Sequence, residues 1–276
     1  EQALLNSLRA KVTAIEKPNF IQLQKADVVV VATGTYDSEG TERPFEMNEE
    51  DEALVRMACA ANKNVIVLVL SGSGVDMSAW NDKVSAIIYG WYPGQAGMQA
   101  IADIMVGKIN PSGKLPVTFY KNVDQLPDFE DYNMTGRTYR YFQGEPLYPF
   151  GYGLSYTTFE LSDIQIESTA VTPDGYVRAS VVVKNTGELE GTEVVQIYTG
   201  RKTASVTQPM KELKDFKRVT LAPGQSCKVE FELPVSRLAF HNRDMVLAVE
   251  EGKYTLTIGT DSQSGLKKYF KIINNN

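Results

Sequence analysis

The spacing of apolar residues changes near Lys121, and this change constrains the fold more than any other feature. Before it, short continuous apolar runs alternate with stretches of helical spacing. After it, apolar residues recur at every second position between turn residues. The first pattern is typical of parallel strands buried on both faces and joined by helices, and the second of β-sandwich strands. We therefore predict an α/β domain followed by an all-β domain.

Three apolar runs predict the parallel sheet, and they lie within residues 25–34, 64–70 and 84–89. Asn48 is placed to cap a helix whose first turn holds four acidic residues, which favour a helix N-terminus. The predicted buried face of that helix contains Leu54, Met57, Ala58 and Ala61. Residues 95–106 predict another helix. The order of elements predicts a parallel-sheet α/β sandwich domain over residues 1–120.

Strict alternation marks the second part of the chain, at residues 177–183, 229–233 and 254–258. Turn residues at 185–187 and 222–224 separate such runs, which predicts a fibronectin III-like β-sandwich over residues 161–276. Residues 121–160 are rich in tyrosine, phenylalanine, glycine and proline. Because exposed aromatic side chains are costly, we expect an ordered connector that packs along the domain surfaces.

Composition excludes several classes of function. The net charge is −6 and no basic stripe is present, which argues against nucleic acid as a partner. The longest apolar runs have strand length, so we expect no membrane span. Cys59 and Cys227 fall in different predicted domains, and His241 is the single histidine. We therefore predict neither a disulfide framework nor a metal site, and no cofactor.

The loops after the three strands are where an α/β sheet binds ligands, and only the first is rich in groups that transfer protons. It contains Asp37, Glu39 and Glu42, followed by Arg43. A partly buried carboxyl beside Gly40 would suit acid/base chemistry, and Arg43 could hold a carboxylate or sugar hydroxyls. The residues equally allow a solvated acidic loop with Arg43 as a local ion-pair partner.

Other motifs carry less chemistry. Residues 71–74 lack a full dinucleotide fingerprint and are better explained as a turn. His241 fits a surface or turn position. Trp80 and Trp91 could stack on a sugar or pack in a core. Residues 133–135 fit a glycosylation acceptor, which matters only in a eukaryotic secretory host.

A series of motifs resembles the C-terminal part of glycoside hydrolase family 3, in the order that family shows. In the first part they lie at residues 26–43, 70–72, 91–95, 110–119, 136–142 and 146–157. Residues 184–187 and 211–216 resemble the fibronectin III-like module of the same family.

The resemblance implies a retaining hydrolase of β-linked sugars, most often β-glucosides, with no cofactor. In such enzymes one carboxylate attacks the anomeric carbon and a second protonates the leaving oxygen. The family places the nucleophilic aspartate on an N-terminal (β/α)8 barrel and the acid/base glutamate on a loop of the second domain. Its register puts the acid/base on Glu39, with Arg43 four residues on. Glu42 is a supporting residue and the reserve candidate.

The departures from the family are also informative. The barrel, its nucleophile and its sugar-binding Lys-His pair are not in these 276 residues, and residues 1–25 do not resemble the opening strand of the α/β domain. We therefore expect a partner, an N-terminal barrel fragment or subunit, besides the carbohydrate substrate, and expect the chain alone to be inactive. The resemblance also implies export to a bacterial periplasm or exterior.

Three alternatives stay open. The chain could be a non-catalytic carbohydrate-binding or scaffold module, since the barrel is missing. The sugar could be a β-xyloside or an N-acetylglucosaminide instead of a glucoside. A nucleotide-binding α/β protein is disfavoured, because no phosphate-cradling loop is found.

Overall fold

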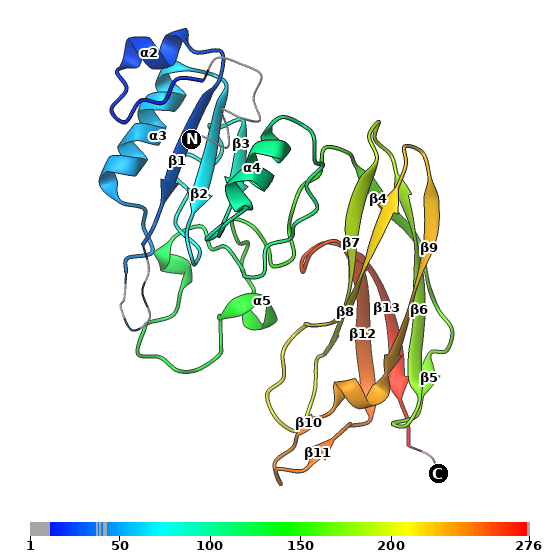
Figure 1. Cartoon of the computed structure of the whole chain (residues 1–276). Helices are drawn as coiled ribbons and strands as arrows, with labels where there is room; N and C mark the ends of the chain where they lie inside the picture. Colours follow the sequence, from blue (N-terminus) through cyan, green and yellow to red (C-terminus); the bar gives the residue numbers. More distant parts are fainter. Residues whose placement is uncertain (1–11, 37, 39, 41–42, 275–276) are drawn as a thin grey trace. The chain divides into compact units, whose positions relative to one another are not determined.

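The computed structural model describes residues 12–36, 38, 40 and 43–274. They form two compact units that are interleaved along the chain (Figure 1). The first unit contains residues up to 109 together with 119–128 and 145–147, and the second contains 110–118, 129–144 and the residues from 148 onward. The domain boundaries at residues 120 and 160 stay predictions.

The first unit is built on a parallel sheet, as predicted. Its strands lie in the order β1 (Val29–Gly34), β2 (Val65–Leu70) and β3 (Ala86–Tyr89). Both pairings are parallel, with Val29 opposite Val65 and Ile66 opposite Ala86. The helices are α2 (Phe20–Lys25), α3 (Glu49–Ala61) and α4 (Gly97–Met105), with a short 3-10 turn η1 (Val123–Gln125).

Helix α3 begins where the sequence predicts. The Asn48 side chain accepts a hydrogen bond from the Asp51 amide at 2.8 Å, which satisfies one of the unpaired N–H groups of the first turn. Its buried face is centred differently from the prediction: Val55 and Ala58 are fully buried, whereas Leu54 is only partly covered. Helical spacing predicts which residues of α3 form its apolar face. Which of them lies at the centre of the buried face depends on how the helix packs on β1 and β2.

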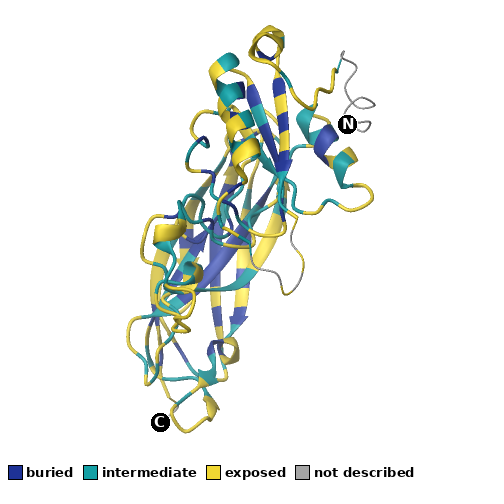
Figure 2. Cartoon of the chain, turned by 90° about the vertical axis from the view of Figure 1, so that its left-hand side faces the viewer, coloured by how far each residue is buried: buried dark blue, intermediate teal, exposed yellow. Residues whose placement is uncertain are grey.

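Strand β1 departs from the prediction that every strand is buried on both faces. Val29 and Val31 are buried, but Val30 and Ala32, on the opposite face, are exposed (Figure 2). Among the described residues β1 pairs only with β2, so it lies at the edge of the sheet. An apolar run in the sequence shows that both faces of a strand can be buried. It does not show which residues bury each face.

The second unit contains a β-sandwich, which confirms the all-β prediction. One sheet has the order β5-β13-β12-β7-β8 and the other β4-β6-β9 (Figure 1). The strands of these two sheets are β4 (Phe159–Ile166), β5 (Ala170–Val171), β6 (Tyr176–Asn185), β7 (Gly191–Arg201), β8 (Glu212–Leu221), β9 (Ser226–Pro234), β12 (Gly252–Gly259) and β13 (Leu266–Ile272). A small hairpin, β10 (Phe240–His241) with β11 (Leu247–Ala248), follows the 3-10 turn η2 (Val235–Leu238).

The core of the sandwich is filled by the residues that alternate in the sequence. The fully or nearly fully buried side chains include Val177, Val181, Phe231, Leu256 and Ile258. Their neighbours along each strand are mostly exposed or partly exposed. Period-two alternation therefore identified the inner face correctly, because successive side chains of a strand point to opposite faces.

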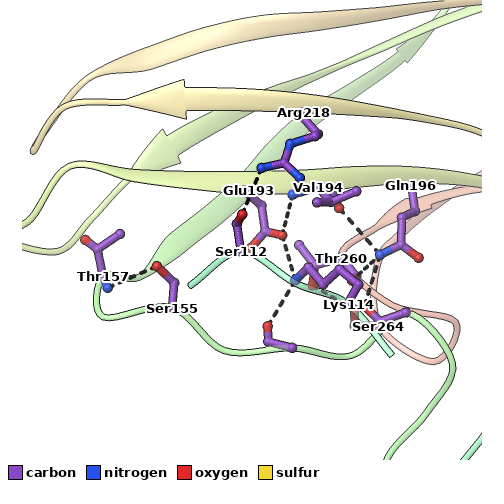
Figure 3. Close-up of polar contacts among 12 residues, drawn as sticks. Ser112, Lys114, Ser155, Thr157, Glu193, Val194, Gln196, Arg218, Thr260 and Ser264 are labelled. Carbon is purple, nitrogen blue, oxygen red and sulfur yellow. Dashed lines mark hydrogen bonds and ion pairs between the residues drawn. The ribbon is translucent and has the colours of Figure 1, made fainter. Parts of the chain in front are cut away.

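Residues of the second unit that precede its first strand pack on the sandwich through ring contacts and a buried ion pair. Tyr139 lies in the short helix α5 (Thr138–Tyr141). Its ring stacks on Phe150 with centroids 4.2 Å apart and packs edge-on against Tyr198 of β7 at 6.0 Å. The Nζ atom of Lys114 lies 2.7 Å from a carboxylate oxygen of Glu193 on β7, and both side chains are almost fully buried (Figure 3). Tyr139 therefore packs on the sandwich as expected. The expectation is wrong for Phe129 and Tyr132 of the same predicted connector, because both rings are exposed.

Candidate functional site

The carboxyl ends of β1, β2 and β3 meet at one edge of the parallel sheet. Gly34 lies opposite Leu70, and Val69 lies opposite Tyr89, so the three strands end at nearly the same level. Residues 35–45, 71–80 and 90–97 follow them. This edge is where open α/β sheets bind ligands.

The first of these loops holds the predicted catalytic residues. Glu39 and its reserve Glu42 lie outside the described residues, as does Asp37, whereas Thr35 and Arg43 are described. Thr35 and Arg43 flank Glu39 and Glu42 in the sequence.

The beginning of the loop is fixed to the end of β2. The Thr35 amide donates to the Leu70 carbonyl at 3.0 Å, and the hydroxyls of Thr35 and Ser71 share a hydrogen bond of 2.6 Å. The Ser71 hydroxyl also bonds to the Ser73 carbonyl at 2.8 Å, which closes the turn after β2. Residues 71–74 thus form a turn, as the sequence indicates.

The end of the loop is fixed to the same turn by Arg43. Its Nη2 donates to the Ser73 hydroxyl at 2.6 Å and to the Gly74 carbonyl at 2.8 Å, and its Nη1 donates to the Pro44 carbonyl at 2.7 Å. The planar, rigid fork of an arginine holds several oxygens in a fixed arrangement. Arg43 therefore positions the backbone that follows Glu42.

Gly34 is required where β1 turns into the loop. A Cβ atom built at this position would lie 2.1 Å from the Leu70 carbonyl oxygen, far inside any possible contact. The close approach lets the loop leave β1 directly against β2. Only glycine permits it.

Aromatic side chains line the neighbouring strand end. Tyr89 packs edge-on against Trp91 and Phe119, with ring centroids 4.8 and 4.9 Å away, and its hydroxyl donates to the Ser73 carbonyl. The Tyr92 hydroxyl donates to the Thr35 carbonyl at 3.2 Å. Hydroxyls beside aromatic rings suit a sugar, which offers both hydroxyl groups and an apolar face.

The two tryptophans have different roles. Trp80 is completely buried, so it belongs to the core. Trp91 is partly exposed and has a φ of 51°, a left-handed conformation that is costly for a bulky residue and is held here by its ring contacts. Sequence reasoning named Trp91 but missed Tyr89 and Tyr92, whose signal was their position at the end of an apolar run.

The other predicted features lie elsewhere. His241 is exposed on β10, which confirms its surface position. Among the described residues, no group of three or more histidine, cysteine, aspartate or glutamate side chains is arranged to hold a metal ion. No helix in the described part of the chain is long and apolar enough to cross a membrane.

Two family models match the sequence. The model of the glycosyl hydrolase family 3 C-terminal domain matches residues 2–156, which is more than half of the chain. The model of the fibronectin type III-like domain matches residues 193–262.

Relatives and solved structures agree with these matches. A periplasmic beta-glucosidase of Salmonella typhimurium is 37% identical over 91% of this chain and 35% of its own length. A xylan 1,4-beta-xylosidase of Xylanibacter ruminicola is 39% identical over 83% of this chain and 26% of its own. The beta-glucosidase of Listeria innocua in complex with glucose superposes with a TM-score of 0.81 and 29% identity, covering 92% of this chain and 37% of that one. The chain thus spans about a third of the length of the proteins it matches.

Proposed function

The chain belongs to glycoside hydrolase family 3, and we propose that it is the C-terminal portion of a retaining β-glycosidase to which it supplies the general acid/base, Glu39. The nucleophilic aspartate belongs to an N-terminal (β/α)8 barrel outside these 276 residues. In this proposal Glu39 protonates the departing glycosidic oxygen and then removes a proton from the water that releases the sugar.

One observation carries the proposal: both ends of the loop that contains Glu39 are attached to the turn after β2. Thr35 holds the beginning through Leu70 and Ser71, and Arg43 holds the end through Ser73 and Gly74. An acid/base needs a carboxyl kept within hydrogen-bond reach of the reacting oxygen. The attachment of Thr35 and Arg43, on either side of Glu39 in the sequence, supports the proposal.

The relatives support the proposed substrate class. Those named above include a beta-glucosidase and a xylan 1,4-beta-xylosidase, two activities on β-linked pyranosides. We propose a β-glucoside as the first candidate and a β-xyloside as the second. We further propose that Tyr92 and Trp91, at the same edge as the anchored loop, contact the leaving group.

The proposed partner is the barrel portion, as part of the same polypeptide, a nicked piece or a subunit. The exposed apolar face beside β1 supports it, because Val28 and Val30 lie open to solvent in this chain. Without the barrel the chain lacks half of the carboxylate pair, so alone it should not hydrolyse a glycoside. We propose a periplasmic or extracellular location, in keeping with the relative from Salmonella.

Substitution of Glu39 in the complete enzyme tests the function. Glu39→Ala should lower kcat/KM for an alkyl glucoside by about 10²- to 10⁴-fold. It should affect a dinitrophenyl glucoside much less, because that leaving group needs no proton. Added azide should raise the rate of Glu39→Ala on the dinitrophenyl substrate and yield a β-glucosyl azide.

Glu42→Ala is the matched control, since Glu42 is a glutamate of the same loop. It should retain its dependence on pH and show no azide rescue. Rates near those of the wild type for Glu39→Ala would refute the assignment. Azide rescue of Glu42→Ala would transfer the acid/base role to Glu42.

A further inference from the structure

The loop formed by residues 129–135 presents apolar side chains to solvent. Phe129 is 75% exposed, Tyr132 is 91% exposed and Met134 is 45% exposed, all within six residues. We call it the aromatic loop; it lies in the second unit and leads into α5 (Figure 1). The two rings alone expose on the order of 300 Å². That area is as large as the largest apolar patch on a typical monomer, and such a patch marks an interaction surface.

Several polar groups of the aromatic loop bond to one another or to Arg137, which follows it. The Asp131 carboxylate accepts hydrogen bonds from the amide and the side chain of Asn133, at 2.9 and 2.7 Å, and these bonds lower the pKa of Asp131. The Arg137 guanidinium donates to the Asp131 and Asn133 carbonyls. The Arg137 amide bonds to the Met134 carbonyl at 3.0 Å. The loop is therefore ordered before any partner arrives.

The base of the loop is attached to β8 of the sandwich and to Met210, just before that strand. The Arg140 carbonyl accepts from the Met210 amide at 2.9 Å, and the Tyr139 hydroxyl accepts from the Leu213 amide at 3.1 Å. Arg140 also forms an ion pair with Glu212 at 3.2 Å. A side chain held on a rigid base loses little conformational entropy on binding, which favours recognition.

The chemistry of the loop favours a protein surface over a sugar. Sugar recognition combines an aromatic face with hydrogen bonds to hydroxyl groups. Here Asp131 and Asn133 bond to each other and Arg137 bonds to the loop backbone, whereas two rings and a methionine present large apolar side chains to solvent beside them. Aromatic residues and methionine are the types enriched at protein–protein interfaces, and methionine adapts its shape to an apolar partner.

We propose that Phe129, Tyr132 and Met134 form a docking surface for the N-terminal portion of the family 3 polypeptide. The relatives supply the occupant, because the chain covers only 35% of the Salmonella protein and 37% of the Listeria structure, leaving roughly two thirds of each to contact it. The inference rests on the proposed function only in requiring that N-terminal portion. It does not depend on Glu39.

Hydroxyl-radical footprinting tests the surface directly. Oxidation of Phe129, Tyr132 and Met134 is measured by mass spectrometry in the 276-residue chain and in the full-length protein. We expect at least fivefold slower oxidation of all three in the full-length protein. Met245, which is 76% exposed on the β10–β11 hairpin, is the internal reference and should change less than twofold. Equal oxidation of the three residues in both proteins would overturn the proposal.

A second measurement separates docking from sugar binding and from catalysis. The double variant Phe129→Ser/Tyr132→Ser should lower the Tm of the full-length protein by several degrees but leave the Tm of the 276-residue chain unchanged, since both rings are exposed there. Protection of the loop in the 276-residue chain by a β-glucan oligosaccharide would overturn the proposal in favour of a sugar site. An active full-length enzyme with an unprotected loop would refute the docking surface and leave the function of Glu39 standing.

Discussion

Removing the charge of Lys114 should destabilise the sandwich strongly. Its Nζ lies 2.7 Å from the Glu193 carboxylate and 3.0 Å from the Gly153 carbonyl (Figure 3). The two charged side chains are only 13% and 9% exposed. Lys114→Met keeps the aliphatic volume but leaves Glu193 charged in a nearly dry site, with the Val194 amide as a remaining donor.

The magnitude follows from the cost of an unpaired buried charge. Removing one partner of a buried ion pair lowers the free energy of unfolding by about 3–5 kcal/mol. Because Glu193 keeps some exposure to solvent, we expect a loss near the lower end, about 3 kcal/mol. Because 1.4 kcal/mol corresponds to a factor of ten, amide exchange in β7 should accelerate about 100-fold. Adding Glu193→Gln to Lys114→Met should recover more than half of the loss, since it removes the charge and keeps an oxygen for the Val194 amide.

Hydrogen exchange of β7 peptides, measured by mass spectrometry, follows the sandwich separately from the first unit. Lys228→Met is the matched control, because Lys228 and Glu230 also lie 2.7 Å apart on the sandwich but are 59% and 69% exposed. It should leave β7 exchange unchanged. Acceleration by less than threefold in Lys114→Met, or a double variant less stable than the single one, would refute the reasoning.

Three further variants test the site and the pH dependence. Arg43→Ala in the full-length enzyme should lower kcat/KM for alkyl glucosides by about 10- to 100-fold through a displaced loop, while dinitrophenyl glucosides react nearly normally. Gly34→Ala should destabilise the first unit by about 2 kcal/mol or more, because its Cβ would collide with the Leu70 carbonyl; thermal unfolding followed by tryptophan fluorescence reports this, since both tryptophans lie in that unit. Hydrogen bonds from Ser205 lower the pKa of Glu250 below its ordinary value of 4.5, so its stabilisation is present above that pH and is lost as pH falls through the lowered pKa. Glu250→Gln should therefore weaken the protein against urea at pH 7 and lose this effect near pH 3.

The sequence could predict those parts of the fold that depend on the local backbone repeat. Alternation with a period of two identified the inward-facing Val177, Phe231 and Leu256, because that repeat is fixed by strand geometry. The cap at Asn48 was equally predictable, since a cap and the amides it satisfies lie within one turn. The motif series also indicated the family that the matches show.

The candidate site was predictable only as a stretch of chain. Its location after the first strand follows from the general rule for parallel sheets, and Glu39 remains a prediction. The partners of Arg43 could not be predicted, because Ser73 lies 30 residues away and meets it only through the pairing of β1 with β2. A hydrogen bond between distant residues leaves no repeat in the sequence.

What the sequence by itself determined is therefore the type of each element, the inner face of the sandwich and the family. Tertiary structure alone decided that Val30 is exposed while Val31 is buried, that Val55 is the centre of α3, and that Lys114 meets Glu193. The physical reason is that periodicity records which face of an element is apolar. The packing of the elements decides which neighbour covers that face and which distant charges form an ion pair.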